Sequence, residues 1–199
     1  ESLLDTQIIA ISKTFPIQDI LPLINNGHKH FGENKIQEAI EKWPEIKKKN
    51  KNLKLHFVGK LQSNKVKFAI PLFDYIHSLD NIKLAEKIAS QQIKINFKPK
   101  IFIQVNIGEE IQKNGVATNE LEGFIDQCQK NFNLNIIGLM CIPPNDNQSE
   151  KYFSRMKELN QKFGFLELSM GMSNDYQLAI KYNSTFLRLG TKIFGNRIK

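Results

Sequence analysis

The amino-acid sequence predicts one (β/α)8 barrel, a TIM barrel, as a single domain that spans residues 1–199. Eight short β-type runs alternate with longer amphipathic segments. No low-complexity linker or change of composition interrupts the alternation, and 199 residues suit one domain at the short end of the range for this barrel. A doubly wound open sheet is the alternative, but the count of eight runs favours the barrel.

The β-type runs are rich in Ile, Leu, Phe and Val. They cover residues 7–15, 29–34, 53–59, 75–80, 100–108, 134–143, 165–173 and 185–195. In the first run, alternation places Ile9, Ile11 and Lys13 on one face. If that face lines the barrel interior, Lys13 stands at the mouth of an apolar cylinder, a position that suits an amine nucleophile.

The segments between these runs have helical character. They include residues 17–27, 34–43, 63–73, 81–92, 119–131 and 149–164. In the fourth of these, Ile82, Leu84, Ala85, Ile88 and Ala89 recur at helical spacing. Asp80 and Asn81 offer an N-cap before this helix, and Ser149 offers one before the last.

Composition excludes several classes of protein. No run of about 18 apolar residues is present, so we expect no membrane-spanning helix. The first residues lack a basic region followed by a long apolar one, which argues against a secretory signal. Cys128 and Cys141 are typical of reduced, buried thiols in a cytoplasmic protein. The four histidines lack the spacing of a metal site, so none is expected.

The net charge of +8 and the pI near 9.4 raise the hypothesis of nucleic-acid binding. The most basic stretch, residues 47–54, ends a helical pattern, where lysines complement the helix dipole and are usually solvated. The excess of lysine is spread over the chain rather than gathered on one face. We therefore expect no nucleic-acid partner.

Polar residues gather where the expected strands end, which is where the active sites of such barrels lie. Lys13 and Arg188 both lie within β-type runs, and such cations are rarely buried without a partner. Residues 168–175 and 188–195 each follow a strand with hydroxyls and a glycine, a pattern typical of a phosphate site. A lysine nucleophile beside a phosphate site fits pyridoxal 5′-phosphate (PLP) held as a Schiff base, or a phosphosugar aldolase.

A resemblance to a known family rests on motifs along nearly the whole chain. They are AISKTFP, HFGENKIQEAIEKW, LHFVGKLQSNKVK, IHSLD, IQVNIGEEIQKNG, GLMCIPP, LSMGMSNDYQLAI and RLGTKIFGNR. Together they resemble the pyridoxal phosphate homeostasis proteins, which are single-domain relatives of the alanine racemase barrel domain. The resemblance implies a PLP-binding barrel without established catalysis that acts in intracellular vitamin B6 balance, by cofactor buffering or delivery.

By motif, the resemblance implies a role for six residues. Lys13 would form the Schiff base, and Asn34 would lie near the cofactor ring. Ser169, Gly190 and Thr191 would hold the phosphate, and Arg188 would face the pyridine nitrogen. In GKLQSNKVK, the turn at Gly59 would lie at the rim of the mouth, where Lys60 and Lys65 attract anions.

One departure concerns the beginning of the chain. The family usually starts with a helix, whereas only ESLLD precedes the first run here, so a barrel shortened at its N-terminus is expected.

In many PLP enzymes a carboxylate opposite the pyridine nitrogen keeps the ring protonated. An arginine in that place can only donate hydrogen bonds and cannot do so. The sequence therefore favours a non-catalytic PLP carrier, a monomer that exchanges cofactor with apo PLP-enzymes. A weak PLP-dependent amino-acid racemase is the alternative.

Overall fold

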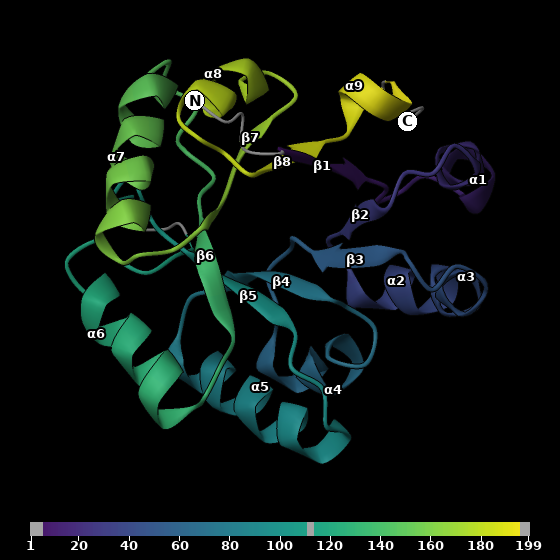
Figure 1. Ribbon diagram of the computed structural model, residues 1–199, viewed down its shortest axis with the longest axis horizontal. Helices are drawn as coiled ribbons and strands as arrows, with labels where there is room; N and C mark the ends of the chain where they lie inside the picture. Colours follow the sequence, from purple (N-terminus) through teal and green to yellow (C-terminus); the bar gives the residue numbers. More distant parts are fainter. Residues whose placement is uncertain (1–5, 111–113, 196–199) are drawn as a thin grey trace.

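The computed structural model describes residues 6–110 and 114–195. Its centre is a closed barrel of parallel strands in chain order (Figure 1). The strands are β1 (Gln7–Ile11), β2 (His30–Glu33), β3 (Lys54–Phe57), β4 (Tyr75–Leu79), β5 (Lys100–Gln104), β6 (Ile136–Met140), β7 (Glu167–Met172) and β8 (Phe186–Leu189). The segment ESLLD, on which the expected N-terminal shortening rests, lies outside the described residues.

Pairing of the first strand with the last closes the barrel. Strand β1 pairs with β2, placing Ile11 opposite Gly32, and also with β8, placing Ala10 opposite Leu189. An open sheet would leave β1 or β8 with a free edge. The prediction of a barrel rather than a doubly wound sheet is therefore confirmed.

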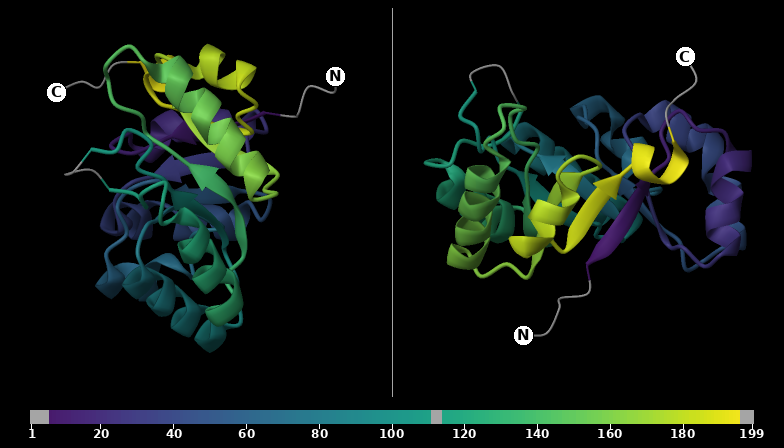
Figure 2. Two further views of the ribbon diagram at one scale, coloured as in Figure 1. Left: turned by 90° about the vertical axis from the view of Figure 1, so that its left-hand side faces the viewer. Right: turned by 90° about the horizontal axis from the view of Figure 1, so that it is seen from above.

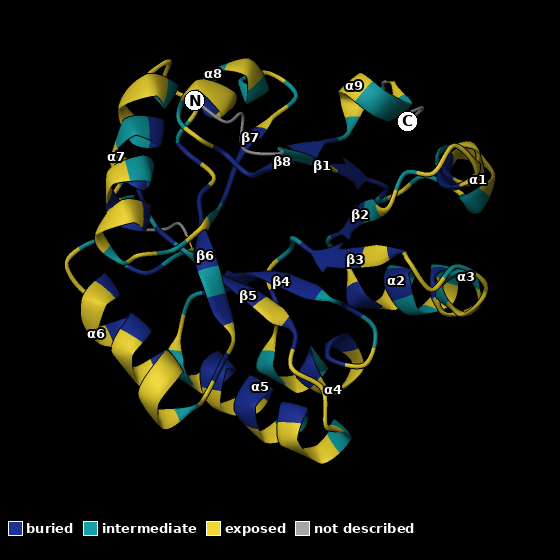
Figure 3. Ribbon diagram, viewed as in Figure 1, coloured by how far each residue is buried: buried dark blue, intermediate teal, exposed yellow. Residues whose placement is uncertain are grey.

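Helices surround the strands on the outside (Figures 1 and 2). They are α1 (Ile17–Asn25), α2 (Ile36–Lys42), α3 (Pro44–Lys49), η1 (Ser63–Lys65), α4 (Val66–Ala69), α5 (Ile82–Ile95), α6 (Leu121–Asp126), η2 (Gln127–Asn131), α7 (Ser149–Lys162), α8 (Tyr176–Lys181) and α9 (Thr191–Phe194). Figure 3 shows the buried strands and the exposed outer sides of the helices. No helix among the described residues is long and apolar enough to cross a membrane.

Two apolar clusters hold the fold together. The larger one lies between strands and helices and contains Ala10, Phe31 and Trp43. The smaller cluster comprises buried side chains of the barrel interior: Ile9, Ile11, Tyr75, Phe102, Met140 and Phe186. Ile9 and Ile11 thus share a cluster separate from that of Ala10, as the alternation in the first strand predicted.

Some expected element boundaries were wrong. The eighth β-type run predicts a strand that ends at residue 195, but β8 ends at Leu189 and Thr191 begins α9. Asn81 is the N-cap of α5, accepting a hydrogen bond from the Leu84 backbone N–H at 2.9 Å, as expected. Ser149, however, is already the first residue of α7, and Gln148 stands at its N-cap.

Candidate functional site

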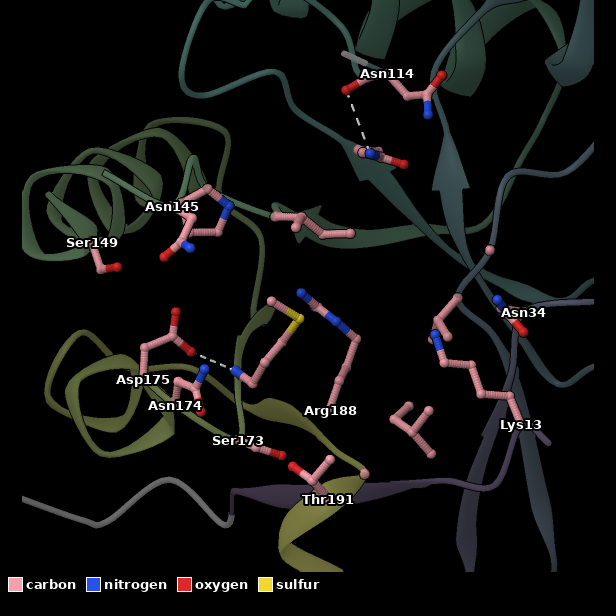
Figure 4. A pocket seen from close by; sticks show the side chains of 18 of the residues that line it. Lys13, Asn34, Asn114, Asn145, Ser149, Ser173, Asn174, Asp175, Arg188 and Thr191 are labelled. Atoms are coloured by element: carbon pink, nitrogen blue, oxygen red, sulfur yellow. Dashed lines mark hydrogen bonds between the residues drawn. The ribbon is translucent and has the colours of Figure 1, made fainter. Parts of the chain in front are cut away.

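A cavity of about 720 Å³ opens at the end of the barrel where the strands terminate. Five of the six site residues named from the sequence line it: Lys13, Asn34, Arg188, Gly190 and Thr191. In Figure 4, Lys13 and Asn34 lie on one side of the cavity, Ser173 and Thr191 lie near the start of α9, and Arg188 lies between these groups. The remaining lining residues are Ile11, Val58, Gly59, Lys60, Gln104, Asn114, Ile142, Pro143, Pro144, Asn145, Ser149, Met172, Ser173, Asn174 and Asp175.

Lys13 lies in a short turn directly after β1. The next residue, Thr14, has a φ of 69°, a left-handed conformation that is an outlier for a β-branched residue. Its backbone N–H donates a hydrogen bond to Oε1 of Glu38 on α2. A strained backbone of this kind persists only where its surroundings hold it, and such strain concentrates at functional sites.

A buried carboxylate fixes the other side of the Lys13 turn. Oε1 of Glu33, at the end of β2, accepts hydrogen bonds from Ser12 Oγ at 2.8 Å and from Trp43 Nε1 at 2.9 Å. Lys42 Nζ lies 2.9 Å from Glu33 Oε1 and also donates to the carbonyl oxygen of Ser12 at 2.9 Å. We call Glu33, Glu38 and Lys42 the carboxylate network. It restrains the chain immediately before and after Lys13.

The position of Asn34 depends on the glycine across from it. A Cβ on Gly59 would lie 2.2 Å from the carbonyl oxygen of Asn34, so only glycine permits this close approach of β2 and β3. The side-chain Oδ1 of Asn34 is buried without a hydrogen-bond partner. An unpaired acceptor at a cavity wall is a group that a ligand can satisfy.

Arg188 projects from β8 into the barrel and is only 5% exposed. Its Nη1 donates to the carbonyl oxygen of Ser169 at 2.9 Å and to Ser169 Oγ at 2.7 Å, and its Nη2 donates to the carbonyl oxygen of Cys141 at 2.8 Å. No carboxylate of the described residues lies within ion-pair distance. Burial lowers the pKa of Arg188, while Cys141 and Asp175 act in the opposite direction.

Ser169 is the one named residue that does not line the cavity. It lies inside β7, is fully buried, and bonds through its hydroxyl with Arg188 and with Nδ1 of His77. Ser173, the residue just after β7, lines the cavity instead. The motif SMGMS contains two serines, Ser169 and Ser173. Ligand-binding groups of such barrels lie just beyond the strand ends, and this rule would have selected Ser173.

Gly171 gives β7 its irregular end. Its φ is +92°, and a Cβ there would lie 2.5 Å from the Cβ of Ala179 in α8. The register between β7 and β8 shifts at this point, between Ser169 and Met172. The shift explains why strand alternation alone does not locate the cavity-facing serine.

Sequence reasoning also missed the interior histidines as a group. His30, His56 and His77 come from β2, β3 and β4 and form consecutive hydrogen bonds of 2.9 Å between their rings. His30, His56 and His77 each lie two residues from a position that faces the barrel interior: Gly32, Val58 and Tyr75, respectively. Alternation along each strand therefore places all three rings inside the barrel. Their mutual contact depends on the stagger of three strands, which the sequence does not show.

Comparison with known proteins identifies the family. A sequence profile described as the alanine racemase N-terminal domain matches residues 2–197. The chain is 36% identical to a pyridoxal phosphate homeostasis protein of Aquifex aeolicus, over 96% of this chain and 87% of the relative. The chain belongs to the pyridoxal phosphate homeostasis protein family. The Escherichia coli member is 33% identical over 96% of this chain and 85% of its own length.

Solved structures agree with this assignment. PipY of Synechococcus elongatus, solved with PLP bound, superposes with a TM-score of 0.88 at 34% identity, covering 96% of this chain and 93% of PipY. An alanine racemase of Clostridium difficile superposes with a TM-score of 0.76 at 14% identity, over 98% of this chain and 53% of the racemase. At that identity the likeness concerns the barrel fold alone.

Proposed function

We propose that this protein binds PLP in the cavity at the barrel mouth and acts in PLP homeostasis, by buffering or delivering the cofactor. The observation that carries the proposal is that a primary amine, Lys13, and a buried arginine without a carboxylate partner, Arg188, line the same cavity. The PLP-bound PipY structure, which shares this fold at 34% identity, supports it.

The polar groups of the cavity fit PLP. Asn34 Oδ1 is a buried acceptor without a donor, which suits the phenolic hydroxyl of the pyridine ring. Arg188 uses three of its five N–H groups on protein oxygens, which leaves the Nε–H and one Nη2–H without an acceptor among the described residues. These donors suit an unprotonated ring nitrogen, so donors and acceptors of ligand and cavity match.

When bound, PLP supplies an aldehyde that condenses reversibly with a primary amine and releases water. Lys13 supplies that amine, and the carboxylate network fixes the turn that carries it. Ser173 and Thr191 supply hydroxyls and Gly190 supplies an accessible backbone for the phosphate. Ser169 holds Arg188 rather than the phosphate.

A non-catalytic role follows from the same residues. Arg188 donates hydrogen bonds and cannot stabilise a protonated ring nitrogen as a carboxylate does, so electron withdrawal by the ring is weak. The described lining residues include no Tyr, His or Cys that could serve as a second acid or base. Besides Lys13 and Arg188, the ionisable side chains among them are those of Lys60 and Asp175. A weak amino-acid racemase that uses one of these is the second candidate.

The partners follow from the proposed carrier role. We propose that the protein exchanges PLP with apo PLP-enzymes in the cytoplasm and acts as a monomer. Buried thiols at Cys128 and Cys141 are consistent with a reducing compartment. The rim carries the exposed Lys60, which attracts the anionic cofactor.

The deciding experiment locates the lysine that binds PLP. Purified protein is titrated with PLP, its absorbance is recorded, and borohydride is added before peptide mapping. We expect the label on Lys13, and we expect Lys13→Ala to abolish the absorbance band near the visible edge. Lys60→Ala is the matched control and should keep the band. A label on another lysine, or an undiminished band in Lys13→Ala, contradicts the proposal.

The racemase candidate needs a separate assay. The PLP-loaded protein is incubated with L-alanine, and the enantiomers are separated by chiral analysis. No D-alanine above the level given by free PLP is expected. Its rapid appearance would replace the carrier role with a catalytic one.

A further inference from the structure

A chain of hydrogen bonds crosses the barrel interior beneath the cavity. Arg188 Nη1 lies 2.7 Å from Ser169 Oγ, which lies 2.9 Å from His77 Nδ1. His77 Nε2 lies 2.9 Å from His56 Nδ1, and His56 Nε2 lies 2.9 Å from His30 Nδ1. We call Ser169, His77, His56 and His30 the interior chain. It runs from Ser169, beside Arg188 of the cavity wall, to His30 at the start of β2, at the opposite end of the barrel.

Counting protons fixes the direction of these bonds. Arg188 can only donate, so Ser169 Oγ is its acceptor. The single hydroxyl proton of Ser169 then has one acceptor within reach, His77 Nδ1. An unprotonated Nδ1 places the proton of neutral His77 on Nε2, from which it is donated to His56 Nδ1. By the same step His56 donates from Nε2 to His30 Nδ1.

The opposite direction leaves a group unsatisfied. If His77 donated to Ser169, the Ser169 hydroxyl proton would have no acceptor among the described residues. A buried hydroxyl without an acceptor is unfavourable, because its proton gives up hydrogen bonds to water and gains none in the protein. The favoured direction also turns the lone pairs of Ser169 toward the guanidinium. The aligned dipoles of the chain therefore stabilise a buried cation that has no carboxylate partner.

This arrangement requires neutral histidines. His56 and His77 are completely buried, and burial lowers the pKa of both well below the usual value. The charge of Arg188 lowers the pKa of His77 further. Stacking of His77 on Phe102 and of His56 on Tyr75, with ring centroids 4.4 Å and 4.1 Å apart, holds both rings in place.

We propose that His77 is a positioning residue for the cofactor. Its Nδ1 accepts a hydrogen bond from the Ser169 hydroxyl, and the Ser169 oxygen then holds Arg188 so that the two unused N–H groups of Arg188 are available to the cavity. His56 and His30 act behind it by setting the His77 tautomer. The proposal rests on PLP binding in the cavity, which it deepens by naming what orients the arginine.

The first test needs no cofactor. Nitrogen-15 NMR of the histidine rings in the PLP-free protein at neutral pH reports the tautomer of each ring. We expect His30, His56 and His77 all to be neutral and protonated on Nε2. Protonation of His77 or His56 on Nδ1, or a charged ring, overturns the assigned direction whether or not the protein binds PLP.

The second test separates positioning from packing. His77→Asn keeps an acceptor close to the position of Nδ1, whereas His77→Leu removes it. We expect His77→Leu to weaken PLP binding about 10-fold or more, equivalent to about 1.4 kcal/mol, and to shift the pH profile of the PLP absorbance. We expect His77→Asn to stay within about 3-fold of wild type. His28→Gln, outside the interior chain, is the matched control and should bind like wild type.

Each result decides between the possibilities. Wild-type affinity in a folded His77→Leu protein overturns the proposal, as does equal weakening by the asparagine and leucine variants. If His77→Leu does not fold, Ser169→Ala replaces it, because this smaller change removes the hydroxyl that links His77 to Arg188. Failure of the wild-type protein itself to bind PLP would refute the proposed function and leave the NMR result standing.

Discussion

Lys13 and Arg188 line the same cavity, yet different kinds of interaction hold them. The turn around Lys13 is tied to the helix layer outside the barrel by the carboxylate network, through Ser12 and the backbone of Thr14. Arg188 is held inside the barrel by neutral oxygens and the interior chain. One side uses ion pairs and the other uses aligned neutral dipoles.

The difference matches the roles proposed for the two residues. A nucleophilic amine needs a fixed attachment point, and the carboxylate network restrains its neighbours in the chain. A guanidinium that faces a ring nitrogen must itself be held, so its own N–H groups are engaged. A carboxylate beside Arg188 would neutralise the charge that is offered to the ligand. Neutral acceptors hold the group without doing so.

The largest effect should follow from Glu33→Gln. The change removes one of the two carboxylates that pair with Lys42, which is only 10% exposed, and leaves Glu38 as its counter-charge. Removing one partner of an isolated buried pair costs about 3–5 kcal/mol, and the remaining pair with Glu38 should reduce the loss to about 2–3 kcal/mol. Urea denaturation should show the loss, and PLP should bind more weakly because the Lys13 turn loosens. Stability within 1 kcal/mol of wild type would show that the carboxylate network does not hold this side of the cavity.

The dependence of stability on pH should distinguish the histidines of the interior chain from the carboxylate network, because the two titrate in different pH ranges. Burial lowers the pKa of His30 to about 4 and those of His56 and His77 well below 6.5, so the unfolded chain binds more protons than the native one. The free energy of unfolding should therefore fall as the pH drops below 6.5. His56 and His77 together contribute a slope of up to about 2.7 kcal/mol per pH unit. The charged groups that face these rings are Lys29, Lys47, Lys54, Asp74, Lys100 and Arg188.

The carboxylate side responds at lower pH. Burial by itself raises the pKa of Glu38, but hydrogen bonds from Lys42 and from the Thr14 backbone outweigh it and hold the pKa below 4.5. Its contribution is complete above pH 4.5 and is lost as the pH falls through the native pKa. Thermal melts from pH 7 to pH 4.5 should thus report the histidine side, and His30→Asn should flatten the curve. An unchanged slope in that variant would contradict this division.

The smallest effect is expected from Glu38→Gln. This side chain is 24% exposed, and the amide oxygen can still accept from Thr14, so we expect a loss of about 0.5–1 kcal/mol at pH 7. Asp126→Asn is the matched control, because the pair of Asp126 at the end of α6 with Lys130 of η2 is exposed and should contribute less. Equal effects of the two variants would mean that holding Thr14 adds nothing to stability.

Sequence reasoning reached the fold because its signals are local. Each strand carries its own inward and outward alternation, as in Ile9 and Ile11, and each helix its own spacing and cap, as at Asn81. The placement of Lys13 and Arg188 at one cavity follows from the rule that strand ends of a barrel share a face. Motif resemblance identified the family, which the comparisons confirm.

Tertiary structure decided what depends on register between strands. Gly171 distorts the end of β7, so Ser173 and not Ser169 reaches the cavity. The interior chain forms because the stagger of β2, β3 and β4 brings three rings into line, and β7 supplies the serine from across the barrel. The sequence by itself determined which residues of a regular strand face inward, because alternation is a property of one strand. Which of them touch was decided only by closure of the barrel, because such contacts join residues far apart in the chain, as in the pair of His77 and Ser169, 92 positions apart.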